Sequence, residues 1–145
     1  MHDQHNPSDV HVPAPDFAPA EVVSLHLDAF GRVGVADTGA DPATTRGLDD
    51  AAVQTAFRFA SPAVRRRIGS AGNLRTLLLS RLYEPLVTFE RSATAPIEVT
   101  GDRARQEVTV MTPDRAEAVY EFRLARADSG PEVGCWLVDA VDRIA

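Results

Sequence analysis

The clearest structural signal in this chain is the run Ala104-Arg105-Gln106-Glu107-Val108-Thr109-Val110-Met111, which is followed by Ala118-Val119-Tyr120-Glu121-Phe122-Arg123-Leu124-Ala125-Arg126. In both runs apolar and polar residues alternate, which is the pattern of a β-strand with one buried face. The segment between them contains Thr112-Pro113-Asp114-Arg115, with proline at the second position of a turn. The two runs therefore predict an antiparallel β-hairpin.

Further strands are expected on both sides of this hairpin. Val87 and Phe89, then Ile97 and Val99, alternate with polar neighbours. Residues 133–142 are apolar on both faces, which is typical of a central or sandwiched strand. Together these segments predict a curved antiparallel sheet of about four strands.

The first half of the chain has a helical period instead. A first helix is expected to begin near Pro19, where proline suits the first helical position, and to end at Gly31 and Gly34. A second helix is expected before Ser61, and a third ends where Pro85 forbids continuation. The residues that recur on one face are Val22, Val23, His26, Leu27 and Phe30 in the first helix, Val53, Ala56, Phe57 and Ala60 in the second, and Leu74, Leu77, Leu78 and Leu82 in the third.

Length and composition indicate one globular domain behind a short tail. The chain has 145 residues, of which 44% are hydrophobic and 25% charged, both ordinary values for a single folded domain. Residues 1–17 hold prolines and histidines without a hydrophobic period and are predicted to be a mobile N-terminal tail. In residues 18–145 helices come first and strands after, which predicts a single α+β domain with the helices packed on the curved sheet.

Charge and cysteine content narrow the class of partner and the compartment. The net charge is −6, and an acidic chain is a poor sequence-independent binder of nucleic acid. No segment approaches the roughly 20 apolar residues of a membrane span, and the first residues lack the pattern of a signal peptide. A single cysteine, Cys135, excludes an intrachain disulfide and favours a reducing compartment. We therefore expect a cytoplasmic protein that binds neither nucleic acid nor membranes.

Three blocks of sequence carry a resemblance to a known family. They are Phe57-Arg58-Phe59-Ala60-Ser61-Pro62 with Gly69 after it, Leu82-Tyr83-Glu84-Pro85-Leu86, and Gly134-Cys135-Trp136-Leu137-Val138-Asp139-Ala140-Val141. With the helix that ends in Leu27-Asp28-Ala29-Phe30, they resemble the domain of unknown function 4864 family over about residues 20–141. The chain departs from the family pattern at Val64, where asparagine is usual, and at Ile68-Gly69-Ser70, where Thr-Gly-Pro is usual.

The resemblance implies a fold more than a function. It implies a cone-shaped domain of the nuclear transport factor 2-like superfamily, in which helices pack on a strongly curved sheet. That superfamily contains isomerases, cyclases, hydrolases and dehydratases as well as non-catalytic dimerisation modules, so the fold by itself assigns no activity.

Five residues are candidates for a pocket between the helices and the sheet: His26, Tyr83, Tyr120, Trp136 and Asp139. His26, on the apolar stripe of the first helix, is either a general base or a buried core histidine. Asp139, in an apolar strand, is either a general base or a solvent-facing carboxylate. The two tyrosines either donate hydrogen bonds into the pocket or bond to the backbone, and Trp136 is a core residue first and a ligand platform second.

The run Arg65-Arg66-Arg67 is a candidate anion-binding patch, against the alternative of a solvated helical face. We expect no metal site, because His2, His5 and His11 lie in the predicted tail and structural metal sites need ligands held by the fold. Ser61 is expected to cap a helix through its hydroxyl, with Pro62 at the first position, and aspartate should serve as well there.

These residues do not assemble a complete catalytic set in sequence. The leading hypothesis is a non-catalytic module without a cofactor, either binding a small apolar ligand between helices and sheet or forming a homodimer through the outer face of the sheet. The alternative is a small enzyme that performs proton transfer on an apolar metabolite, using His26 or Asp139 with Tyr120. The two differ in one observable, because an enzyme needs at least two of these groups in one cavity.

Overall fold

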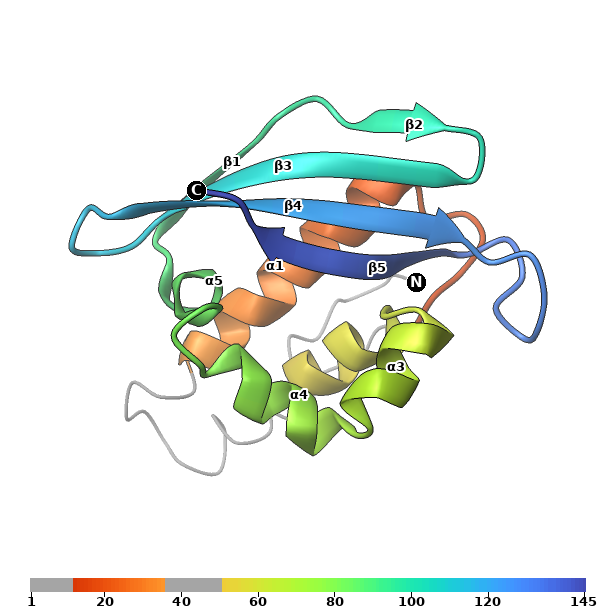
Figure 1. The fold of residues 1–145 in the computed structure, drawn as a ribbon, viewed down its shortest axis with the longest axis horizontal. Coiled ribbons are helices and arrows are strands. Elements are labelled where there is room, and N and C mark those ends of the chain that lie inside the picture. Colours follow the sequence, from red (N-terminus) through yellow and green to blue (C-terminus); the bar gives the residue numbers. More distant parts are fainter. Residues whose placement is uncertain (1–11, 36–50) are drawn as a thin grey trace, which may run out of the picture.

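The computed structural model describes residues 12–35 and 51–145 (Figure 1). Most of the predicted tail, including His2, His5 and His11, lies outside the described residues. The helices are α1 (Pro19–Val35), a helical segment at 51–58, α3 (Pro62–Ile68), α4 (Ala71–Leu78) and α5 (Glu84–Thr88). The strands are β1 (Arg91–Thr94), β2 (Glu98–Thr100), β3 (Arg103–Met111), β4 (Glu117–Arg126) and β5 (Trp136–Arg143). The predicted α+β class is confirmed.

The strands form one open antiparallel sheet in the order β1-β3-β4-β5, with β2 paired to the far end of β3. Strands β3 and β4 pair over their whole length, from Arg103 opposite Ala125 to Met111 opposite Glu117. This confirms the hairpin that alternation and the proline turn predicted. The sheet has five strands rather than about four, because residues 91–100 form two short strands against β3.

The segment around Pro85 differs from the prediction. Helix α4 ends at Leu78, and Pro85 lies in the first turn of α5, so Val87 is on a helix and Phe89 is its C-terminal cap residue. Proline blocks the continuation of a helix but also suits the first turn of a new one, and the short apolar stretch after it is compatible with either structure. Packing selects the helix, because Leu86 and Val87 are both buried against the core.

The first helix is longer than predicted, since α1 runs through Gly31 and Gly34 to Val35. Glycine in a helix interior costs only about 1 kcal/mol relative to alanine, which the packing of α1 outweighs. A Cβ at Gly31 would stand 3.7 Å from the ring of Phe89, an ordinary van der Waals distance, so packing does not require glycine at this position.

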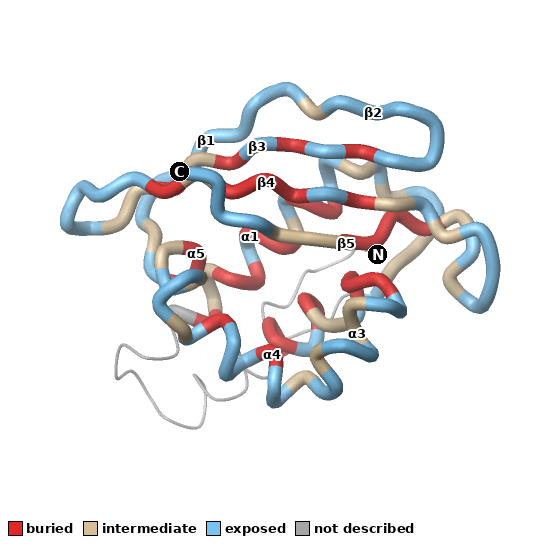
Figure 2. Tube along the Cα trace, in the orientation of Figure 1, coloured by how far each residue is buried: buried red, intermediate tan, exposed pale blue. Residues whose placement is uncertain are grey.

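Residues 133–142 were predicted to form a central or sandwiched strand, and the central position is wrong. Strand β5 lies at the edge of the sheet and pairs only with β4 among the named strands. Its first residues are nevertheless buried, because the chain at Phe59–Ser61 runs parallel to it and covers its free edge (Figure 2). The amide of Val138 donates to the carbonyl of Phe59 at 2.7 Å, and the amide of Ser61 donates to the carbonyl of Val138 at 2.9 Å.

The core lies between the inner face of the sheet and the helices, where α1 crosses β3 and β4 (Figure 2). The side chains of Tyr120 and Phe122 on β4 are fully buried there. Phe17, at the predicted boundary of the tail, packs edge-on against Phe59 with ring centroids 5.9 Å apart. Among the described residues no helix is long and apolar enough to cross a membrane.

Candidate functional site

A pocket of about 100 Å³ lies between the helices and β5. Residues from α1, the segment at 51–60, α3, α4 and β5 form its walls, and almost all of them are apolar. They are His26, Phe30, Ala56, Ala60, Val64, Ile68, Leu74, Leu77, Leu78, Tyr83, Val138, Ala140 and Val141. An enclosed apolar cavity of about 150 Å³ binds benzene. This pocket is smaller but partly open to solvent, so a single aromatic ring would fill it with part of the ring left outside.

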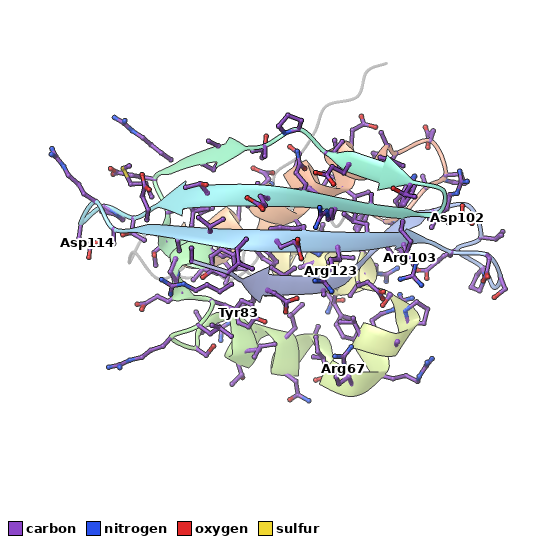
Figure 3. All side chains as sticks on the ribbon, turned by 45° about the horizontal axis from the view of Figure 1, so that its top comes forward. Arg67, Tyr83, Asp102, Arg103, Asp114 and Arg123 are labelled. Carbon is purple, nitrogen blue, oxygen red and sulfur yellow. The ribbon has the colours of Figure 1, made fainter. Side chains whose placement is uncertain are left out.

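The pocket adjoins a surface groove of about 420 Å³ between α3, α4 and β5. Six residues, among them Val64, Leu77 and Tyr83, line both, so the two spaces are neighbours across one wall. The groove adds a polar rim, which consists of Arg67, Asn73, Asp139 and Asp142. Figure 3 shows Tyr83 and Arg67 in the layer of helices alongside β5. An apolar interior with a polar rim is the usual arrangement of a small-molecule site.

His26 is the most deeply buried polar side chain of the pocket wall, with 3% of its surface exposed. Its ring makes edge contacts with Phe30, Phe59 and Phe122, at centroid distances of 5.3, 6.3 and 6.4 Å. Burial disfavours the charged imidazolium and lowers the pKa of His26 to about 4, although the backbone carbonyls of Val22 and Ala56 oppose this in part. The ring is therefore neutral at pH 7.

The hydrogen bonding of this ring is incomplete. Nδ1 of His26 is buried and has no hydrogen-bond partner, although the Val22 and Ala56 carbonyls lie close enough to influence the ring. A neutral imidazole carries one N–H donor and one acceptor nitrogen, so it can donate to only one of those carbonyls.

The two tyrosines bond to the backbone. Tyr83 lines the pocket, and its hydroxyl donates to the carbonyl of Val141 at 3.1 Å. Burial, with the nearby Asp142 carboxylate, raises the pKa of Tyr83 above its usual value. Tyr120 stacks on Tyr83 at 6.3 Å but does not line the pocket, and its hydroxyl donates to the carbonyl of Leu82 at 2.6 Å.

Asp139 and Trp136 lie away from the pocket. Asp139 accepts a hydrogen bond from Oγ of Ser61 at 2.9 Å and pairs with Arg103 at 3.5 Å, at the surface end of the groove. The guanidinium of Arg126 lies over the Trp136 ring, 5.5 Å from its centroid. Of the five predicted pocket residues, only His26 and Tyr83 line this pocket.

The three arginines of the predicted anion-binding patch do not form one patch. Arg65 forms a bidentate pair with Glu132, with N–O distances of 2.5 and 3.1 Å, so it anchors the β4–β5 loop to α3. Arg66 and Arg67 are exposed, and Arg67 is at the rim of the groove. Successive helical residues are separated by about a quarter turn, so three in a row do not share a face.

Ser61 caps α3, as predicted, with Oγ accepting from the amide of Val64 at 3.4 Å. The bond that the same hydroxyl donates to Asp139 was not predicted, because the two residues are 78 positions apart. This bond joins two of the blocks that carry the family resemblance.

The helical wall of the pocket was missed in the sequence. Val64 and Ile68 on α3 are four residues apart, and Leu74 and Leu78 on α4 have the same spacing. That spacing places each pair on one helical face, which was the available signal. Val64 and Ile68 are also among the positions named above as departures from the family pattern, and both are apolar.

Metal and thiol chemistry find no support in the described part of the chain. Within residues 12–35 and 51–145, no three His, Cys, Asp or Glu side chains come together as a metal site would require. Cys135 is buried, and burial raises the pKa of its thiol, followed by the influence of Glu132 and Asp16.

Comparison with known proteins supports the family and nothing finer. No curated protein and no solved structure matches the chain. The family model of DUF4864, a domain of unknown function, matches residues 46–144, which include α3 to α5 and the whole sheet but not α1 with His26. The match covers more than half of the chain, and the protein therefore belongs to the DUF4864 family.

Proposed function

We propose that this protein is a non-catalytic module that binds a small, mainly apolar molecule in the pocket between the helices and β5. The observation that carries the proposal is the apolar pocket of about 100 Å³ beside a groove with a polar rim. Burying an apolar group in it contributes roughly 25 cal/mol per Å² of surface removed from water.

The alternative, a small enzyme that transfers protons, receives less support. A general base works best with a pKa near the working pH, whereas the pKa of His26 is lowered to about 4. Asp139 lies outside the pocket, and the hydroxyls of Tyr83 and Tyr120 donate to backbone carbonyls. The pocket thus offers His26 no second group with which to exchange a proton among the described residues.

Three further expectations belong to this proposal. They concern the superfamily plan of the fold, the location of the protein and its oligomeric state. The packing of helices on one face of an antiparallel sheet supports a nuclear transport factor 2-like, cone-shaped plan. A single buried cysteine supports a cytoplasmic location. A homodimer through the outer face of the sheet would combine binding with assembly.

Titration with toluene tests the binding site. Toluene added to the full chain should shift the methyl resonances of Leu74, Leu78 and Val138, and at a hundred times its Kd should stabilise the fold by about 2.7 kcal/mol. Val64→Phe fills the pocket and should weaken toluene binding at least tenfold. Val99→Phe is the matched control, because Val99 is exposed on β2, far from the pocket, and this variant should bind as the wild type does.

Two results would contradict the proposal. One is the absence of any toluene-dependent shift at the pocket residues. The other is equal toluene affinity in the wild type and in a folded Val64→Phe variant, which would show that the pocket is not where the ligand binds.

A further inference from the structure

The imidazole of His26 combines two features that a purely structural histidine rarely has. It forms part of the wall of a pocket, and one of its nitrogens, Nδ1, is buried without a hydrogen-bond partner. Buried polar groups in folded proteins are nearly always hydrogen-bonded, and an exception asks for an explanation such as a missing ligand.

We propose that the ligand carries a hydroxyl group, and that this hydroxyl hydrogen-bonds to the imidazole of His26. The ligand class is a small neutral alcohol or phenol, with its apolar part in the pocket. The inference rests on the proposed binding function and adds the chemistry by which the ligand is selected.

A hydroxyl matches this ring whichever nitrogen holds the proton. Neutral imidazole offers one donor and one acceptor, and a hydroxyl group is both a donor and an acceptor. The other hydroxyl near the ligand, that of Tyr83, already donates to the carbonyl of Val141. Selection for a polar group inside the pocket therefore falls to His26.

The charges around the pocket exclude an ionised ligand. An ion in the apolar pocket would lose its hydration, which is costly unless a counter-charge compensates it. The neutral ring of His26 supplies no counter-charge. At the rim Arg67 is accompanied by Asp139 and Asp142, so the groove has no excess of positive charge to attract a carboxylate or phosphate.

The ring is also held in a fixed orientation, as recognition of one group requires. It is enclosed by the edge contacts with Phe30, Phe59 and Phe122. His26→Phe keeps a ring of similar shape in this cage and removes both nitrogens, which makes it the variant that isolates the hydrogen bond.

The experiment compares phenol with toluene, which have nearly the same shape and differ in a hydroxyl against a methyl group. In the wild type, phenol should bind at least as tightly as toluene. In His26→Phe, the phenol affinity should fall at least tenfold, while the toluene affinity stays within threefold. Phenol, and not toluene, should also shift the ¹⁵N resonances of the His26 ring in the wild-type protein.

The outcomes separate the two proposals. Toluene binding with no phenol preference, or an unchanged preference in His26→Phe, would overturn the hydroxyl inference and leave the apolar site standing. Failure of both compounds to bind would overturn the site itself. If His26→Phe does not fold, the ¹⁵N shifts of the wild-type ring decide, and their constancy on phenol saturation would refute the inference.

Discussion

At the scale of single residues, Ser61 connects the helical layer with the sheet through one hydroxyl group. Oγ accepts from the amide of Val64 and donates to Asp139, and the backbone amide of the same residue donates to Val138. Capping alone would make aspartate as good as serine at this position. The neighbouring carboxylate of Asp139 changes that expectation.

Substitutions at Ser61 should therefore have unequal effects. Ser61→Ala should cost about 1–2 kcal/mol, because it removes a cap and a hydrogen bond to a carboxylate. Ser61→Asp should cost more than Ser61→Ala at pH 7, because two carboxylates would lie within hydrogen-bonding distance. Urea denaturation measures both, and adding Asp139→Asn to Ser61→Asp should restore stability. A Ser61→Asp variant as stable as the wild type would show that the Ser61–Asp139 contact does not exist in solution.

His26 should make stability depend on pH. Its pKa falls from 6.5 in the unfolded chain to about 4 in the folded protein, so between these values the unfolded state binds more protons. The contribution of the buried, neutral His26 ring to the unfolding free energy is fully present above pH 6.5. It is lost as the pH falls toward 4, by about 3 kcal/mol in total. The difference in unfolding free energy between wild type and His26→Phe, measured from pH 7.5 to 4.5, should change by most of this amount. A constant difference would mean that the ring is not buried.

At the scale of secondary-structure elements, sequence patterns predicted those elements that depend on interactions between residues close in the chain. The β3–β4 hairpin needed only alternation and the turn at Pro113. The helix at Pro85 and the edge position of β5 depend on contacts between distant segments, namely α5 with the core and Phe59–Ser61 with Val138. Neither contact leaves a period in the sequence, so the same apolar residues were compatible with two placements.

The stability of the sheet should depend more on the buried side chains of β4 than on those of β5. Trp136 was expected to be a core residue, and it is buried, but it lies at the start of an edge strand with 7% of its surface exposed. Phe122 is central and completely buried. Truncation of a buried aromatic residue typically lowers the unfolding free energy by about 3–5 kcal/mol. We expect Phe122→Ala to lower it by more than Trp136→Ala does. Chemical denaturation compares them, and the opposite order would contradict this view of the core.

At the scale of the whole molecule, the candidate site was only half visible in the sequence. His26 and Tyr83 follow from an apolar stripe and a helix end. Tyr120, Trp136 and Asp139 were assigned to the same pocket because they lie in apolar strands, but the pocket meets β5 at Val138, Ala140 and Val141, on both sides of the register shift opposite Arg123 and Leu124. A register shift changes which side chains face the helices, and sequence alternation does not reveal it.

Assembly is the least local property and remains a prediction. The outer face of the sheet carries linked ion pairs, in which Arg105 contacts Glu98 and Glu121, and Arg123 contacts Glu121 (Figure 3 labels Arg123). A homodimer through this face would have a polar interface, so its dissociation should increase as salt is raised from 50 mM to 500 mM. Sedimentation velocity at both salt concentrations tests this, and a monomer under both conditions at high protein concentration would contradict it.

The pocket itself is open to one direct measurement, the crystal structure of the full chain under xenon pressure. Xenon enters dry apolar cavities and depends on no knowledge of the natural ligand. The account predicts a xenon atom between the helices and β5, in contact with Phe30, Leu74 and Val138. A structure in which α3 and α4 close onto β5 and leave no space for xenon would contradict it.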